Sequence, residues 1–179
     1  MAKGKVSPEL IEQFKQIVGE KYVYTDKEKL EPYAHDEVTD PHYMKEPQVV
    51  VLPATTEEVS KVVKLCYEND TVMVPRAAGT GLAAGAVATF GGVIISIERM
   101  NNIIEIDKDN MVCVTEPGVT TAVLQESVQK EGLFYGGDPC SGDSCFIGGN
   151  VATNAGGNRA VKYLSLIHIS EPTRLDVIS

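Results

Sequence analysis

One stretch decides the fold: QVVVLPATTEEVSKVVKLCYENDTVMVPRAAGTGLAAGA, residues 48–86. Its β-branched beginning, closed by Pro53, predicts a strand. Thr55 or Thr56 then predicts the N-cap of a helix, because the apolar residues that follow recur at intervals of three and four. The apolar residues 72–74 predict a second strand. A strand, a helix and a strand within about 30 residues form a βαβ unit, which requires parallel strands and a helix on one face.

The end of this stretch, PRAAGTGLAAGA at 75–86, has almost no side chains that could pack, so we expect a loop that exposes its backbone. Gly79-Thr80-Gly81 followed by Ala84 fits the dinucleotide motif GxGxxG/A, and Glu98 follows at about 20 residues, as in that fingerprint. In that motif, however, a helix begins at the second glycine and its N-terminus meets the pyrophosphate. The sequence LAAGAVATFGG at 82–92 contains three glycines, which argue against such a helix and against a nicotinamide dehydrogenase.

A loop that returns into a strand can still bind a pyrophosphate, because successive backbone N–H groups form an anion nest. Thr80 would add a hydroxyl donor and Arg76 a positive charge, the less favoured alternative being an Arg76 that is solvated or salt-bridged at the surface. A second glycine-rich stretch, IGGNVATNAGG at 147–157, offers backbone together with the amides of Asn150 and Asn154. Glycine clusters can also be simple turns. Two of them in one chain nevertheless indicate a single large ligand.

The rest of the chain contains further helices and strands. Ser7 followed by Pro8 predicts a helix start, and Gly19 predicts its end. Residues 26–40 are polar and are expected to form an arm outside the core. Other predicted elements are a β-meander over 92–97, 103–107 and 111–115, a helix capped by Thr120 or Thr121 and ended by Gly132, and a short helix at 150–154.

Composition excludes several classes of protein. The chain has 179 residues, of which 43% are hydrophobic and 23% charged, so it is one domain or little more and no large multidomain enzyme. Its net charge of −9 repels nucleic acid and anionic lipid, and a phosphate ligand would need local help from backbone amides. No apolar run reaches the length of a membrane span and no signal peptide is evident, so we predict a cytoplasmic protein without a membrane span.

Metal binding is not favoured by the sequence. The four cysteines match neither a CxxC pair nor a zinc framework, and we expect buried or half-buried free thiols. His35 and His42 lie near Asp36, Glu37 and Asp40, and these side chains could form a metal cluster. A solvated polar arm is the preferred interpretation, and no metal ligand is assigned.

Three motifs follow one another along the chain: PRAAGTGLAAGA, then Glu116-Pro117-Gly118, then DPCSGDSCFIGGNVATNAGG. With these motifs in this order, the sequence resembles the FAD-linked oxidases related to the glycolate oxidase D subunit and to D-lactate dehydrogenases. The resemblance runs from about Gln48 to Tyr163. It implies an α+β fold of the PCMH type, with a βαβ subdomain and a second α+β subdomain, incomplete at the C-terminus. It divides the chain into an N-terminal helical arm (1–46), an FAD-binding domain (47–163) and a tail (164–179).

The resemblance also implies which residues bind the cofactor. The first loop would cradle the pyrophosphate, and the later segments would pass along the flavin and its linker. Related proteins that attach FAD covalently often have a histidine at the place of Thr80, so noncovalent FAD is implied here. The family usually has glycine where this chain has Ala77, and we expect this change to be tolerated. The implied cofactor-binding residues are Pro75, Arg76, Ala77, Ala78, Gly79, Thr80, Gly81, Leu82, Gly85, Ala86, Pro117, Gly118, Ser141, Ser144, Gly148, Gly149, Asn150, Ala152, Asn154 and Gly157.

The tail LSLIHISEPTRLDVIS at 164–179 departs from the family. It resembles the translation of a sequencing adapter, so we expect an artificial terminus, the alternative being an authentic closing strand. In the family, the groups that bind the hydroxy-acid carboxylate lie in the part beyond this point. No catalytic residue is therefore assigned.

The sequence thus predicts the FAD-binding part of an oxidoreductase that oxidises a small 2-hydroxy acid such as glycolate or D-lactate. The electron acceptor is not identified, and this chain is expected to be inactive alone. The alternatives are a nucleotide-binding module without catalysis and an inactive truncated product.

Overall fold

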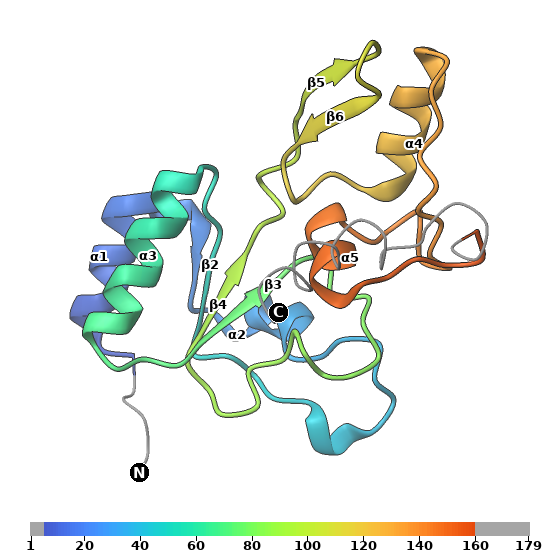
Figure 1. The fold of residues 1–179 in the computed structure, drawn as a ribbon. Helices are drawn as coiled ribbons and strands as arrows, with labels where there is room; N and C mark the ends of the chain where they lie inside the picture. The colour runs from blue at the N-terminus through green and yellow to red at the C-terminus, as the bar shows by residue number, and fades with distance from the viewer. Residues whose placement is uncertain (1–5, 160–179) are drawn as a thin grey trace, which may run out of the picture. The chain divides into compact units, whose positions relative to one another are not determined.

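The computed structural model describes residues 6–159, and the chain divides into two compact units with a boundary between Asn101 and Asn102 (Figure 1). Each unit has a core of its own. The predicted tail at 164–179 lies outside the described residues. Among the helices of residues 6–159, none combines the length and the apolar content that crossing a membrane requires.

The first unit is built on a four-stranded sheet with the order β1-β2-β4-β3. Strand β2 (Val49–Val51), strand β3 (Met73–Arg76) and strand β4 (Val93–Ser96) are parallel, and β1 (Val23–Tyr24) pairs antiparallel with β2. The predicted βαβ unit is confirmed, because β2 and β3 run in the same direction and helix α3 (Thr56–Glu68) lies between them in the sequence. They are not neighbours, however, since β4 lies between them.

The predicted β-meander over 92–97, 103–107 and 111–115 is wrong. The first of these runs, 92–97, contains β4. This strand pairs in parallel with both β2 and β3 and is buried at all four positions. A strand that is apolar on both faces fits the middle of a parallel sheet, whereas a meander strand usually has one solvated face. The other two runs pair only with each other, in the second unit.

Helices α1 (Pro8–Val18) and α3 (Thr56–Glu68) pack on one face of this sheet (Figure 1). Both begin as predicted: the Ser7 Oγ accepts from the N–H of Leu10, and the Thr55 Oγ1 accepts from the N–H of Glu58. Strand side chains alternate between the two faces. On the helix side lies a core formed by Phe14, Val49, Val51, Val62, Cys66, Val93 and their neighbours.

The opposite face of the sheet is covered by residues that the sequence placed outside the core. Helix α2 (Lys27–Leu30) brings Leu30, which is 3% exposed, against Val50 and Ile94. The expectation that residues 26–40 form an arm without core contacts is therefore wrong at this residue. Its isolated apolar side chain gives no periodic pattern from which burial could be predicted. Three 3₁₀ turns complete this part of the chain, at Glu20–Tyr22, Glu31–Tyr33 and Pro41–Tyr43.

The second unit contains a hairpin and two helices. Strands β5 (Ile103–Asp107) and β6 (Val112–Thr115) are antiparallel, and helix α4 (Thr121–Lys130) follows with Thr120 at its N-cap. Helix α5 (Ile147–Thr153) begins three residues earlier than predicted. The core of this unit consists of Val119, Leu124, Val128 and Ile147, with partly buried side chains of the hairpin packed against it.

The return of the chain into β4 depends on Gly92. Its φ is +95°, and a Cβ added there would overlap the carbonyl oxygen of Val72. We predict that Gly92→Ala lowers the free energy of unfolding by more than about 2 kcal/mol, through backbone strain and steric overlap together. Gly91→Ala is the matched control, because Gly91 also has a positive φ of +73° but only an ordinary contact with Gln48. It should cost about 1 kcal/mol. Equal losses in chemical denaturation would contradict this account of β4.

Candidate functional site

The first glycine-rich segment leaves the sheet at the carboxyl ends of its parallel strands. Strand β3 ends at Arg76 and β4 ends at Ser96, and these two residues are register partners. Between β3 and β4, residues 77–92 contain neither a helix nor a strand, which confirms the prediction made from the glycines. In open parallel sheets, ligands bind outside the carboxyl ends of the strands. Residues 77–86, here called the first loop, begin at such an edge.

The backbone of the first loop has room for a ligand at two of its glycines. Gly81 and Gly85 have no positive φ, and a Cβ added at either would meet nothing within 4 Å. Gly79 differs, because its φ is +76° and an added Cβ would overlap the guanidinium of Arg76. Ala77 has no positive φ, so the alanine at this position carries no left-handed strain. Among the alanines of the first loop, Ala84 adopts the left-handed conformation, with a φ of +55°.

Arg76 holds the first loop to the rest of the unit. The side chain is 7% exposed, and its Nη1 donates to the carbonyl oxygens of His35 at 2.9 Å and Ala86 at 3.2 Å. Its Nη2 donates to the carbonyl oxygen of Pro32 at 3.2 Å, and the guanidinium lies 5.5 Å from the centre of the Tyr33 ring. These contacts show a buried scaffold role for Arg76. Direct contact between Arg76 and a ligand stays a prediction.

Two acidic side chains, Asp36 and Glu98, lie near Arg76, but within residues 6–159 neither forms a direct ion pair with it. Burial lowers the pKa of Arg76, while Tyr33, Asp36 and Glu98 act in the opposite direction. The Tyr33 hydroxyl donates to the Glu98 Oε1 at 2.5 Å. Burial first, and then this hydrogen bond to Glu98, raise the pKa of Tyr33 well above its usual value. Tyr33 therefore stays a neutral donor, and Glu98 accepts from it inside the protein rather than serving as the free ribose acceptor of a nicotinamide fingerprint.

In the second unit, the structure brings together two of the predicted cofactor-binding segments. The N–H of Gly148 donates to the carbonyl of Pro117 at 2.8 Å, and the N–H of Ile147 donates to Val119 at 2.9 Å. Thr120 and Phe146 form an antiparallel bridge between the same segments. The Glu-Pro-Gly turn and the start of the second glycine-rich stretch therefore lie side by side within this unit.

The two asparagines of the second stretch have different surroundings. Asn150 is 8% exposed, and its Nδ2 donates to the Thr121 Oγ1 at 2.7 Å. Thr121 in turn contacts the Cys145 Sγ at 3.1 Å, so Asn150 belongs to a buried polar network. Asn154 is exposed and ends α5 in the left-handed conformation, with φ +57°. A ligand contact by either amide stays a prediction.

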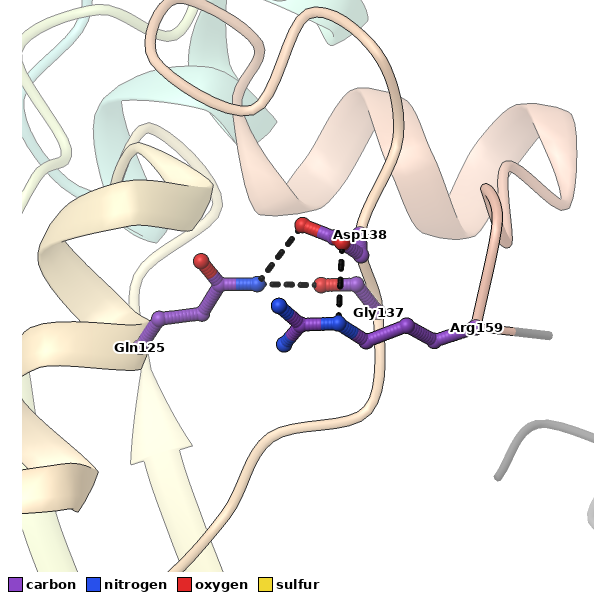
Figure 2. A network of polar contacts seen from close by, with 4 residues as sticks. All are labelled: Gln125, Gly137, Asp138 and Arg159. Atoms are coloured by element: carbon purple, nitrogen blue, oxygen red, sulfur yellow. Dashed lines mark hydrogen bonds and ion pairs between the residues drawn. The ribbon is translucent and has the colours of Figure 1, made fainter. Parts of the chain in front are cut away.

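A polar network around Asp138 was not predicted from the sequence (Figure 2). The Gln125 Nε2 donates to the carbonyl of Gly137 at 2.7 Å, and the Arg159 Nε pairs with the Asp138 Oδ2 at 3.0 Å. Gln125 and Arg159 also line an open cavity of about 710 Å³ in this unit. Gly157 has φ +75° and is packed so tightly on Asp138 that a Cβ would overlap its carbonyl. These contacts join residues that are far apart in the sequence, and no sequence motif predicts them.

Metal ligation finds no support around the two histidines. Throughout residues 6–159, no group of three or more His, Cys, Asp or Glu side chains is placed to hold a metal ion. The four cysteines are free. Cys66 and Cys145 are buried as expected, whereas Cys140 is exposed, so the expectation of buried or half-buried thiols is wrong at that residue.

Comparisons with known proteins show which family the chain is similar to. A family model described as "FAD binding domain" matches residues 47–169. The D-lactate dehydrogenase of Anaerostipes hadrus is 46% identical over 161 residues, which cover 89% of this chain and 33% of that protein. The glycolate oxidase subunit GlcD of Bacillus subtilis is 39% identical over 131 residues, covering 73% and 27%. The chain thus spans about a third of the length of the curated relatives it matches.

Solved structures share the fold. An alkyldihydroxyacetonephosphate synthase matches with a TM-score of 0.80 at 24% identity, covering 92% of this chain and 32% of the other. A p-cresol methylhydroxylase matches with a TM-score of 0.62 at 27% identity, covering 70% and 25%. The predicted α+β fold of the PCMH type is therefore confirmed.

The scaffold role of Arg76 predicts a specific loss of stability. Arg76→Met would leave the carbonyls of Pro32, His35 and Ala86 without their shared donor, and we expect it to lower the free energy of unfolding by about 3 kcal/mol. Arg76→Lys keeps the charge but not the fork of donors, so its loss should be intermediate. Chemical denaturation of the chain without added ligand measures both. A Met variant as stable as the parent would show that these three bonds do not organise the loop.

Proposed function

Because the chain belongs to the family of FAD-binding domains, we propose that it holds FAD noncovalently through the backbone of the first loop and of the segments 117–118 and 148–157. The resemblance seen in the sequence is confirmed by this family and by its relatives. The residues of the site, and the convergence of the segments on one ligand, are the proposed part. The observation that carries the proposal is the first loop, which begins at the carboxyl edge of the parallel strands with open space over Gly81 and Gly85.

The residues of the first loop fit a diphosphate. The chain carries a net charge of −9, so an anionic ligand needs a locally positive place. The loop supplies backbone amides, and the buried Arg76 guanidinium lies directly against Gly79. A charge fixed in a buried site acts more strongly on a ligand than one in water. Thr80, at the place where covalently flavinylated relatives often have a histidine, supports a dissociable cofactor.

We also propose that the chain is the flavin part of an oxidoreductase for a small 2-hydroxy acid. The names of the two curated relatives, a D-lactate dehydrogenase and a glycolate oxidase subunit, support this substrate class. When bound, FAD takes up the two electrons that leave the substrate as its hydroxyl carbon is oxidised. The residues of this chain bind and orient the cofactor, and none is assigned to the substrate proton. A cytoplasmic location stays a prediction. The division of the chain into an arm (1–46), an FAD-binding domain (47–163) and a tail (164–179) stays a prediction as well.

Binding of FAD is tested by two glycine substitutions with different expected results. Gly81→Ala adds a methyl group in open space, so we expect unchanged or slightly higher stability without ligand. If the pyrophosphate approaches this backbone, the same change should weaken FAD binding by about 10-fold or more. Gly79→Ala should lower both stability and FAD affinity, because its Cβ would overlap Arg76. Titration of the apo chain, followed by flavin fluorescence, gives the affinities.

Two outcomes would contradict this proposal. Failure of the parent chain to bind FAD, while it remains folded, would remove the proposed function. Normal FAD affinity in the Gly81→Ala variant would show that the pyrophosphate does not lie on this part of the loop.

The redox proposal is tested with a chimera. Residues 1–163 of this chain are joined to the remaining two thirds of the Anaerostipes hadrus D-lactate dehydrogenase, with which the chain shares 46% identity. We expect the chimera to bind FAD and to reduce a dye with D-lactate, and the chain alone to do only the former. A chimera that binds FAD but oxidises no hydroxy acid, or a chain that turns over D-lactate by itself, would contradict the proposal.

A further inference from the structure

Two buried side-chain atoms within residues 6–159 have no hydrogen-bond partner: the Asp36 Oδ2 and the Ser96 Oγ. Asp36 is only 5% exposed. A hydroxyl such as that of Ser96 can rotate, but a buried carboxylate oxygen without a donor loses its hydration and gains nothing in return. A donor for such a group has to come from outside residues 6–159, and a bound ligand or a buried water molecule can supply it.

Asp36 is fixed beside the first loop by both of its neighbours in the sequence. The carbonyl of His35 accepts from Arg76 at 2.9 Å, and the N–H of Glu37 donates to the carbonyl of Gly81 at 3.0 Å. Ser96, which carries the other unpartnered atom, is the register partner of Arg76. Both unsatisfied groups therefore lie around the carboxyl end of β3, where the proposed cofactor loop begins.

No donor to the Asp36 Oδ2 comes from residues 6–159. The Asp36 Oδ1 accepts from the N–H of Val38 at 3.0 Å, which leaves Oδ2 alone. Arg76 is close enough for its charge to interact with that of Asp36, but its guanidinium donates to three carbonyl oxygens. No ion pair involving Asp36 occurs in the part of the chain that the structure describes.

The chemistry of a carboxylate selects one kind of partner on a dinucleotide. An ionised carboxylate only accepts hydrogen bonds, so it repels phosphate oxygens and attracts hydroxyl groups. FAD carries hydroxyls on both its ribose and its ribityl chain. We propose that Asp36 is a further residue of the cofactor site, and that its Oδ2 accepts a hydrogen bond from a hydroxyl of the bound FAD. This inference rests on the proposed function and places part of the N-terminal segment, 1–46, in the binding site.

The test uses a matched pair of substitutions in the 179-residue chain. Asp36→Asn keeps the side-chain oxygen that accepts from Val38 but replaces the charged Oδ2. Asp40→Asn is the control, because the Asp40 Oδ1 accepts from the N–H of His42 at 2.9 Å in the same kind of turn, and this turn is exposed. FAD affinity is measured by fluorescence titration, and stability without ligand by thermal denaturation.

We expect Asp36→Asn to weaken FAD binding by about 10- to 100-fold, the usual effect of losing a hydrogen bond to a charged group. Stability without ligand should change little, because the hydrogen bond from Val38 is kept and the lost attraction to Arg76 is offset by removal of a buried charge that has no hydrogen bond at Oδ2. Asp40→Asn should alter neither quantity. A purely structural aspartate would instead lower stability and affinity together.

Two smaller ligands, ADP and FMN, show whether the ribose or the ribityl chain of FAD carries the hydroxyl that donates to Asp36. If ADP loses affinity for the Asp36→Asn variant as FAD does, the ribose is the donor. If FMN loses affinity and ADP does not, the ribityl chain is the donor, and either result supports the proposal. The proposal is overturned if the parent binds FAD and Asp36→Asn binds it equally well, or if the variant loses stability and affinity in parallel. Failure of the parent to bind FAD would instead refute the proposed function on which it rests.

Discussion

The site in the first unit depends on one buried cation. Arg76, at the last position of β3, donates to carbonyl oxygens of Pro32, His35 and Ala86, which come from two distant parts of the chain. These bonds fix where the first loop starts and where it turns back. They also explain why position 79 is glycine, since the guanidinium occupies the space of a Cβ. The N-terminal segment is thereby joined to the loop that the family resemblance identifies as the cofactor cradle.

The buried Arg76 lets an acidic chain offer a locally positive place to an anionic ligand. A chain with a net charge of −9 has to attract a dinucleotide that is itself an anion. A surface lysine or arginine would be screened by salt, whereas a buried guanidinium and oriented backbone amides are not. Asp36 and Glu98 lie nearby and favour the charged form of Arg76, and Glu98 also accepts a hydrogen bond from Tyr33, whose pKa is raised by burial. In the proposed site, Arg76 and the backbone amides would attract the phosphates, and Asp36 would accept from a hydroxyl of the same ligand.

Local features of the fold were predictable, and long-range partners were not. The caps at Ser7 and Thr55 and the helix-breaking glycines after Gly81 act within a few residues, so the sequence shows them directly. The position of β4 between β2 and β3 depends on a choice among strand partners that no local pattern records. Likewise, Arg76 bonds to residues 41 and 44 positions away, and Asp36 looks like one acidic residue among several in a polar segment.

The central proposal is that the backbone of the first loop, residues 77–86, binds FAD. Amide hydrogen exchange of the chain, with and without saturating FAD, tests it most directly, because slowed exchange reports each segment independently. We expect slower exchange in residues 77–86, and also at Gly118 and in residues 148–157, whereas Pro117 has no amide proton to exchange. Unchanged exchange in residues 77–86, with FAD bound, would contradict the proposal.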